Sequence, residues 1–314
     1  MTLVDDFEAE RPRLLRIAYR LTGSVVDAED AVQEAWLRLD GARDRDEPSN
    51  LQAWLTRVVS RLCLDRLGSA AKRRETYVGQ WLPEPIVRPI GAAVEPDPLD
   101  VVVQDEDARL GALVVLDALT PPQRVAFVLH DVFSVPFDEV GETLGIGTDA
   151  ARQHASRARR AVADAPEPTP DPEHEEAVGR FLAAMATGDL DAVVATLHPD
   201  VFVIGDANGT TNTAVNVIHG PDKFARFFLG LFARYGMAAI DSFQPVLVNG
   251  QLGLWTDGWA GADRRSSSPA RISGFTVRDG LIAATYDIAN PEKFAGVRLE
   301  PSQAPHSEDA ESRS

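Results

Sequence analysis

Five polar side chains suited to base and phosphate recognition are spaced along residues 148–163. They are Arg152, Gln153, Ser156, Arg157 and Arg160, and the stretch from Ala150 to Ala163 holds four arginines and no acid. Arginine forks pair with guanine edges and phosphates, and glutamine can pair with adenine. The residues left to face inward are small or apolar: Ala151, Ala155, Ala158 and Val162. The pattern indicates a helix that lies on nucleic acid, and a solvated basic face is the alternative.

Caps and glycines mark the helices that would position this basic face. A helix predicted at residues 101–119 leads into these helices. Thr120 followed by Pro121 is typical of a helix N-terminus, and a second short helix is predicted from about residue 137 to 144. Gly145 can adopt the left-handed backbone of a tight turn, and Gly147 with Thr148 then opens the basic helix with the hydroxyl as its cap. The order predicts a helix-turn-helix unit whose last helix enters the DNA major groove.

A second basic group lies on one face of a helix predicted to begin near Asn50 and in the loop beyond that helix. Residues 57–74 contain one acid, Asp65, and six basic residues: Arg57, Arg61, Arg66, Lys72, Arg73 and Arg74. Trp54 and Tyr77 lie close by in the sequence, and basic side chains near aromatic ones suit single-stranded or melted nucleic acid. Core packing is the alternative role for the tryptophan.

The helix predicted from Ser24 to about residue 40 is acidic outside its core stripe. Ser24 and Asp27 form an approximate capping box, and one buried stripe is predicted: Ala28, Val32, Ala35, Trp36 and Leu39. Such a helix is usually only solvated, but it can also dock on a basic partner.

Composition restricts how the protein can bind DNA. The net charge of the 314 residues is −17, and non-specific affinity for DNA comes mostly from neutralising phosphates. A protein this acidic should bind DNA poorly alone and need a partner to hold it there. The single cysteine, Cys63, excludes an internal disulfide, and the sequence has neither an apolar run of membrane-spanning length nor an export signal. These features predict a cytoplasmic protein that is not bound to a membrane.

Two proline-rich segments divide the chain. Residues 77–100 hold five prolines and the sequence WLPEP at Trp81–Pro85, which we interpret as an extended linker with a docking segment. Residues 165–172 read as a stiff spacer. An α+β domain is predicted beyond it, with helices at 173–187, 189–197 and from Pro221 to Gly236, and a strand at 201–204. The predicted buried side of the helix that starts at Pro221 consists of Phe224, Phe227, Phe228, Leu231, Phe232 and Tyr235. Hairpins turning at Asn249-Gly250 and Asp279-Gly280 predict a curved antiparallel sheet around the helices.

Several of these motifs resemble those of a bacterial sigma factor. DAEDAVQEAWLRL (Asp27–Leu39), the segment Trp54–Arg57 and the basic end at Arg74 are similar to region 2 of the extracytoplasmic-function group, and Leu119–Val162 is similar to region 4. The third domain resembles SnoaL-like members of the NTF2-like superfamily. With WLPEP and Asn290–Phe294, which is similar to an NPDKL-type motif, the chain resembles the J-type sigma factors that carry this extension.

The resemblance implies a multidomain fold of two all-α sigma domains and an α+β NTF2-like cone. Its boundaries are region 2 at 1–76, the linker at 77–100, region 4 at 101–164, the spacer at 165–172, the SnoaL-like domain at 173–296 and a disordered tail at 297–314. The implied function is promoter-specific initiation with core RNA polymerase, modulated by the third domain. The implied partners are the β′ clamp helices, the β flap, promoter DNA and a small-molecule ligand of the cone, without a membrane, catalytic residue, metal or cofactor.

Site residues follow from the same resemblance. The polymerase contacts would be Asp27, Asp30, Val32, Gln33, Glu34 and Leu37. Contacts to the −10 element would come from Arg57, Arg61, Arg66, Arg73 and Arg74, and contacts to the −35 element from Arg152, Gln153, Ser156, Arg157 and Arg160. The interdomain regulatory residues would be Trp81, Leu82, Pro83, Glu84, Pro85, Asp206, Asn290, Pro291, Lys293 and Phe294.

One departure and two alternatives bear on the third domain. The group's DGGGK-type loop reads Asp206–Thr210 (DANGT) here, so the lysine is missing and any salt bridge that it makes elsewhere is in doubt. The candidates for acid–base catalysis are Asp206, His219, Asp257 and Asp287, but no two have a spacing that demands pairing. The alternative functions are a stand-alone helix-turn-helix regulator with a ligand-sensing domain, and a small-molecule enzyme with a DNA-binding appendage.

Overall fold

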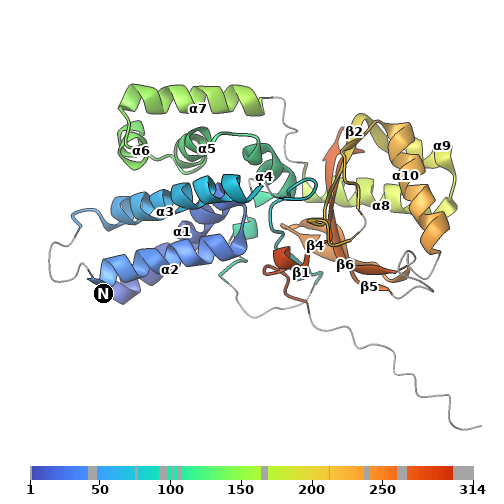
Figure 1. Ribbon diagram of the computed structural model, residues 1–314, viewed down its shortest axis with the longest axis horizontal. Helices are drawn as coiled ribbons and strands as arrows, with labels where there is room; N and C mark the ends of the chain where they lie inside the picture. The colour runs from blue at the N-terminus through green and yellow to red at the C-terminus, as the bar shows by residue number, and fades with distance from the viewer. Residues whose placement is uncertain are drawn as a thin grey trace, which may run out of the picture.

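The structure is a computed structural model that describes residues 2–41, 48–74, 77–91, 98–100, 102–104, 108–163, 169–211, 213–236, 241–259 and 267–299. A helical half and a sheet-containing half lie side by side, and α4 (Leu110–Asp117) lies where the two meet (Figure 1). Within the described ranges, no helix combines the length and apolarity that a membrane span requires.

The first helical unit consists of α1 (Leu3–Thr22), α2 (Val25–Gly41) and α3 (Leu51–Arg74). Pro12 lies inside α1, and Gly23 ends that helix in the left-handed conformation. The predicted cap of α2 is confirmed, because Ser24 Oγ accepts a hydrogen bond from the Asp27 amide at 3.1 Å. The predicted core stripe of α2 is buried except for Trp36, which is partly exposed and lies 4.9 Å from the Phe7 ring.

The second helical unit contains the predicted helix-turn-helix. After η1 (Val102–Gln104) and α4, it runs through α5 (Pro121–Phe127), the π turn η3 (Val128–Val132), α6 (Phe137–Leu144) and α7 (Thr148–Val162). Gly145 ends α6 at φ 69°, which confirms the predicted turn. The capping role of Thr148 is wrong, because Gly147 is the N-cap and no side chain caps α7.

The continuous helix expected from residue 101 to 119 is also wrong. Arg109 precedes α4 with an extended backbone (φ −58°, ψ 145°), so α4 begins only at Leu110. The Arg109 side chain instead donates to the Thr169 carbonyl at 2.7 Å and pairs with Asp171 at 2.8 Å. This arginine therefore ties the start of α4 to the segment that leads into the third domain.

The two helical units share one hydrophobic core. A single cluster of buried side chains contains Leu14 and Leu55 from the first unit and Leu129 and Ala155 from the second. Arg124, only 3% exposed, crosses this boundary and donates to the Leu21 carbonyl at 3.1 Å. The two helical units therefore form one packed body in this structure.

The third domain places α8 (Asp171–Thr187), α9 (Leu190–Val194) and α10 (Pro221–Tyr235) on a sheet. Its own strands are β2 (Leu197–Asp206), β3 (Ile218–His219), β4 (Gln244–Val248), β5 (Gln251–Trp259), β6 (Ser268–Arg278) and β7 (Leu281–Ile288). Both predicted hairpin turns are confirmed. The sheet is mixed, because β2 runs parallel to β7, and this corrects the expected antiparallel sheet. Such a pairing needs a long crossover, here supplied by β3, α10, β4, β5 and β6.

The two faces of this sheet are covered differently. One face packs against α8 and α10 through Phe181, Phe224 and Phe275, while the other buries Trp255 and Tyr286. Only part of the predicted buried side of α10 is fully buried: Phe224 is, whereas Phe228 against Phe181 of α8 and Tyr235 against Trp259 of β5 stay partly exposed. The partly exposed members of that side are Phe227, Phe228, Leu231, Phe232 and Tyr235.

The linker supplies an additional strand to this sheet. Its β1 (Val87–Pro89) pairs antiparallel with β4, with Val87 opposite Val248. On the other side, the Val87 amide donates to the Gly296 carbonyl and the Arg298 amide donates to the Val87 carbonyl, both at 3.0 Å. The complete strand order is β1-β4-β5-β6-β7-β2-β3. Part of the predicted linker is therefore an integral strand of the third domain.

Candidate nucleic-acid interface

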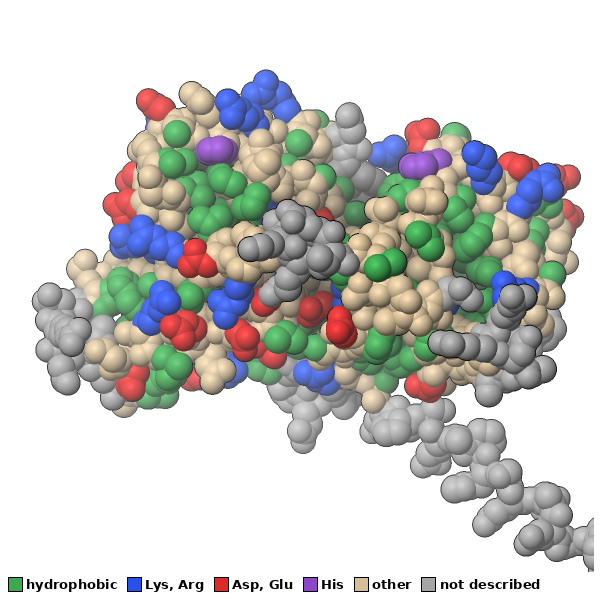
Figure 2. Space-filling model, viewed as in Figure 1, with side chains coloured by type: hydrophobic (Ala, Val, Ile, Leu, Met, Phe, Trp, Pro, Cys, Tyr) green, Lys and Arg blue, Asp and Glu red, His purple; other side chains and the backbone are tan. Residues whose placement is uncertain are grey.

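Helix α7 presents the basic face that its sequence predicts. Its three alanines Ala151, Ala155 and Ala158 are fully buried, which turns the opposite side outward. Of the predicted −35 residues, Ser156 is half-buried and four are exposed: Arg152, Gln153, Arg157 and Arg160. Basic side chains gather over the C-terminal half of α7 at the edge of the molecule (Figure 2).

Ion pairs on this surface are exposed and easily released. Arg152 pairs with Asp149 at 2.9 Å within the helix, and Arg159 pairs with Asp131 at 2.6 Å. Exposed pairs of this kind stabilise a protein by at most about 1 kcal/mol. The α7 face can therefore exchange these carboxylates for phosphates without a large energetic cost.

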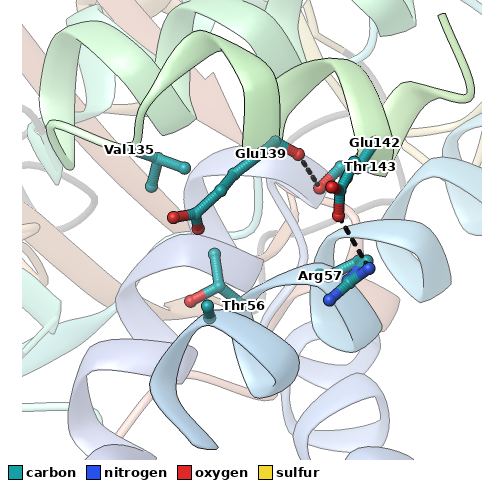
Figure 3. A pocket seen from close by; sticks show the side chains of 7 residues that line it. Thr56, Arg57, Val135, Glu139, Glu142 and Thr143 are labelled. Carbon is teal, nitrogen blue, oxygen red and sulfur yellow. Dashed lines mark hydrogen bonds and ion pairs between the residues drawn. The ribbon is translucent and has the colours of Figure 1, made fainter. Parts of the chain in front are cut away.

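The arginines of α3 are placed differently, because two of them bind to α6. Arg57 Nη1 lies 2.8 Å from a carboxylate oxygen of Glu142 (Figure 3). Arg61 donates to the carbonyls of Glu142 at 2.6 Å and Thr143 at 3.3 Å. These carbonyls lie in the last turn of α6, where the helix dipole favours a cation. Two predicted −10 residues thus bind the second helical unit.

The remaining predicted −10 residues do not join this contact. Arg66 lies 3.7 Å from Asp27, a predicted polymerase contact on α2. Arg73 and Arg74 close α3, which therefore includes residues expected in the following loop, and their side chains lie outside the described residues.

A cavity of about 20 Å³ lies in the seam between α3 and α6. Glu139 from α6 and Thr56 from α3 face each other across it, and Arg57 and Glu142 lie at one side (Figure 3). This volume holds about one water molecule. The cavity is therefore a packing gap of the closed interface and not a site for a larger ligand.

The outer face of α2 combines acids with exposed apolar groups. Asp30, Gln33 and Leu37 are exposed, and Asp27 and Glu34 are half-buried. Leu37 is 57% exposed, and Val26 on the same helix is 46% exposed. Val32 is only 2% exposed and belongs to the core. Its predicted direct contact with polymerase is corrected, because this side chain positions the helix from within.

Four of the predicted interdomain residues meet with Tyr77 in a cluster that we call the clasp: Leu82, Asp206, Asn290 and Lys293. Asp206 is fully buried and accepts hydrogen bonds from the Tyr77 hydroxyl, from the Leu82 amide at 2.7 Å and from the Lys293 ammonium group. Lys293 also donates to the Leu82 carbonyl, and Asn290 Nδ2 donates to the Tyr77 hydroxyl at 3.0 Å. The Asp206 carboxylate is therefore paired with Lys293, which lies in the segment similar to the NPDKL-type motif.

Aromatic rings surround the clasp. The Trp81 ring lies 4.1 Å from Lys293 Nζ, and Phe294 packs edge-on against Trp255 at 5.4 Å. Burial raises the pKa of the Tyr77 hydroxyl, and the hydrogen bond to the Asp206 carboxylate raises it further. Pro291 is exposed and begins the short helix η4 (Pro291–Lys293), which Asn290 caps.

The WLPEP segment also docks on the first helical unit. A Glu84 carboxylate oxygen accepts hydrogen bonds from the amides of Val25 at 2.7 Å and Val26 at 3.4 Å, at the N-terminus of α2. Pro83 and Pro85 are buried beside it. Burial raises the pKa of the Glu84 carboxyl, while these hydrogen bonds lower it. The segment therefore connects the third domain with the helix predicted to bind polymerase.

Three functional residues were missed by sequence reasoning: Tyr77 as a clasp member, Arg88 and Asn249. Arg88 is 7% exposed and binds Asp100 at 2.5 Å and the Gly296 carbonyl at 3.0 Å. Asn249 is fully buried, although its sequence context indicates only a hairpin turn. The strand β1 is only three residues long, so its sequence pattern is too short to predict a strand or the contacts of Arg88.

The four candidates for catalysis are not brought together. Asp206 belongs to the clasp, whereas Asp287 lies on the opposite face of the sheet and pairs with Arg271 at 2.9 Å. Asp257 is exposed and accepts a hydrogen bond from the Trp255 indole, and His219 is exposed on β3. Within the described residues, no group of three His, Cys, Asp or Glu side chains could hold a metal ion.

Comparisons with known proteins agree with this division of the chain. The model of Sigma-70 region 2 matches residues 7–73, that of Sigma-70 region 4 matches residues 112–162 and that of the SnoaL-like domain matches residues 178–285. The ECF RNA polymerase sigma factor SigJ of Mycobacterium tuberculosis is 55% identical over 304 residues, which cover 96% of each chain.

Two further comparisons extend this result. The probable ECF RNA polymerase sigma factor SigI of M. tuberculosis is 37% identical over 203 residues, covering 62% of this chain and 67% of that protein. The crystal structure of M. tuberculosis SigJ matches with a TM-score of 0.81 and 54% identity, covering 95% of this chain and 100% of that one. The chain therefore belongs to the extracytoplasmic-function family of RNA polymerase sigma factors, with a SnoaL-like domain fused at the C-terminal side of region 4.

Proposed function

We propose that this protein binds core RNA polymerase and directs transcription initiation at specific promoters. The observation that carries the proposal is that two arginine-bearing helices, α3 and α7, belong to the region 2 and region 4 matches of an otherwise acidic chain. The outer face of α2 would contact the polymerase through Asp30, Gln33 and Leu37, with Asp27 and Glu34 at its border. The isolated protein has a net charge of −17 and should bind DNA weakly, so polymerase would supply most of the affinity for DNA.

Each arginine-bearing helix would read one promoter element. The α3 arginines would approach the melted −10 strand, where unstacked bases meet protein side chains. The exposed residues of α7 would enter the major groove at −35, some on bases and some on phosphates. The proposed boundaries are those of the sequence prediction, except that β1 of the linker belongs to the third-domain sheet.

The closed arrangement has to open before both elements can be read together. Promoter positions −10 and −35 lie about 25 base pairs apart, or about 85 Å along the duplex at 34–36 Å per turn. In the structure, Arg57 of α3 touches Glu142 of α6, and α6 packs on α7. These helices are much too close for the two elements, and the α6 contacts occupy Arg57 and Arg61.

The third domain would set how readily this opening occurs. The linker between regions 2 and 4 is held by the clasp and by β1, and Leu82, Ile86 and Val87 are at most 1% exposed. Covalent fusion keeps the docking partner at a high effective concentration. The domain would thus modulate the sigma factor without a separate protein, and no catalytic role is needed for it.

Run-off transcription with purified bacterial core polymerase tests the proposal. The full chain should initiate on a promoter from a sequence library, and the double variant Gln33→Ala, Leu37→Ala should lose most of this activity because it removes exposed side chains of the α2 face. Glu29→Ala is the matched control, because Glu29 is exposed on the same helix but is not a predicted contact.

A second outcome would favour the stand-alone regulator. Duplex promoter binding by the protein alone, unaffected by either α2 variant and without initiation on any promoter, would contradict the sigma assignment. The acidic surface of α2 and the contact between α3 and α6 would then need another explanation.

A further inference from the structure

The hairpin turn between β4 and β5 places one buried side chain at the junction of all three domains. Asn249 is 0% exposed. Its amide nitrogen donates to the Tyr19 hydroxyl of α1 at 2.9 Å and to the Ala108 carbonyl before α4 at 2.7 Å. Its amide oxygen accepts from the Ile86 amide of the linker at 3.0 Å, and its backbone amide donates to the Ile86 carbonyl at 2.8 Å.

These contacts engage both amide protons and the amide oxygen of one asparagine. Tyr19 is itself fully buried and donates its hydroxyl proton to the Glu84 carbonyl at 2.5 Å. A buried polar group that loses its partner without gaining water is costly, so each contact supports the others. Withdrawal of α1, the linker or the α4 lead-in would leave buried polar atoms without their partners.

Turn geometry alone does not account for this burial. Asn249 has φ 50°, and Asp279 in the β6–β7 turn has nearly the same value, φ 52°. The Asp279 side chain is nevertheless 82% exposed. The β4–β5 turn is pressed against the lead-in to region 4, since a Cβ on Gly250 would lie 2.9 Å from the Val103 carbonyl. The local fold thus requires a residue that tolerates positive φ, and the junction requires an amide.

We infer that Asn249 is a positioning residue that couples the third domain to both sigma domains, so that the closed arrangement holds or opens as one unit. The inference rests on the proposed function for its biological meaning. The coupling itself is a property of the free protein. Through this residue, the β4–β5 turn contacts α1, the linker and the lead-in to region 4 at the same time.

Asn249→Gly tests the coupling in the full chain. Glycine accepts the positive φ of the turn, so this change removes the side-chain contacts while preserving the backbone. Hydrogen exchange followed by mass spectrometry should show faster exchange by on the order of ten-fold in three places together: the last turn of α1, linker residues 82–88 and the first turn of α4. Tyr19→Phe removes only the hydrogen bonds of the Tyr19 hydroxyl, so it should accelerate exchange in the same three segments to a smaller extent.

Asp279→Gly is the matched control, because it makes the same backbone change at the exposed twin turn. It should leave those three segments unchanged. Exchange in β6 and β7 should stay slow in Asn249→Gly, which shows that the third domain remains folded. Acceleration confined to the β4–β5 turn, or to only one of the three segments, would overturn the inference.

Transcription by the same variants separates this inference from the proposed function. Exchange is measured without polymerase, so three-segment acceleration with unchanged promoter output would support the coupling and overturn control by the third domain. Uncoordinated exchange in a variant that still initiates transcription would overturn the coupling and leave the sigma assignment in place. The expected result is three-segment acceleration with altered output.

Discussion

The carboxylate of Asp206 shows how one buried charge joins distant segments. It is fully buried, and its oxygens accept hydrogen bonds from a hydroxyl, a backbone amide and an ammonium group. Two of these donors precede Asp206 in the sequence and one follows it. A buried ion pair contributes little net stability, but removal of one partner leaves an uncompensated charge. The clasp is therefore sensitive to single substitutions at Asp206 or Lys293.

Lys293→Met should destabilise the protein by about 3–5 kcal/mol, because it leaves the Asp206 carboxylate buried without its cation. The double variant Lys293→Met, Asp206→Asn should recover part of that loss, because the charge itself is gone. Urea unfolding of the full chain measures both values. Lys223→Met on the exposed face of α10 is the control and should change stability little. Equal stability of the single and double variants would contradict a charge-based clasp.

The helix-turn-helix depends on two glycines for different reasons. Gly145 has φ 69°, and a Cβ there would meet nothing within 4 Å. Gly141 lies inside α6, where a Cβ would approach the Ile146 carbonyl to 2.8 Å. The first position restricts backbone conformation and the second restricts the approach of the turn to the helix.

Gly145→Ala should cost about 1–2 kcal/mol from left-handed strain alone, and Gly145→Asn should cost less. Gly141→Ala should displace the turn and with it α7. Its affinity for the −35 duplex should therefore fall by more than its loss of folding stability accounts for. Thermal unfolding and competition for a −35 duplex by the assembled holoenzyme measure the two effects. If both alanine variants lost duplex binding in proportion to stability, the distinction between strain and close approach would be wrong.

At the scale of the whole molecule, the three domains are folded against one another. The outer face of the third-domain sheet is covered by Leu82 and Val87 of the linker and by Leu110 of α4, all at most 4% exposed. The sigma half thus uses the third domain as part of its own apolar packing. This arrangement explains why a simple domain deletion is an unsuitable test of regulation.

A chain that ends at Ala163 should expose the apolar side chains that the third domain covers. It should bind the dye ANS more strongly than the full chain and should scatter more light at equal concentration. The same short chain carrying Leu82→Ser and Val87→Thr should bind less dye, because fewer apolar groups are exposed. Dye binding equal to that of the full chain would show that the apolar side chains of the linker and α4 stay buried without the third domain.

Local rules in the sequence determined most elements of this protein. The cap at Thr120, the left-handed turn at Gly145 and the two hairpin turns depend on residues close together in the chain. The alanine spacing of α7 likewise predicted its exposed basic face, and the motifs of regions 2 and 4 predicted the family. These features need no knowledge of the tertiary fold, since each is settled within one or two helical turns or one hairpin.

Only the tertiary structure decided which of these surfaces are available. The binding of Arg57 to α6, the pairing of Asp206 with Lys293 and the burial of Asn249 all join residues that are distant in the sequence. The bonds Arg57–Glu142, Lys293–Asp206 and Asn249–Tyr19 span 85, 87 and 230 positions. The strand β1 was missed for the same reason. Burial and pairing over such separations depend on how whole elements pack, and no periodicity within one segment encodes the identity of its distant partner.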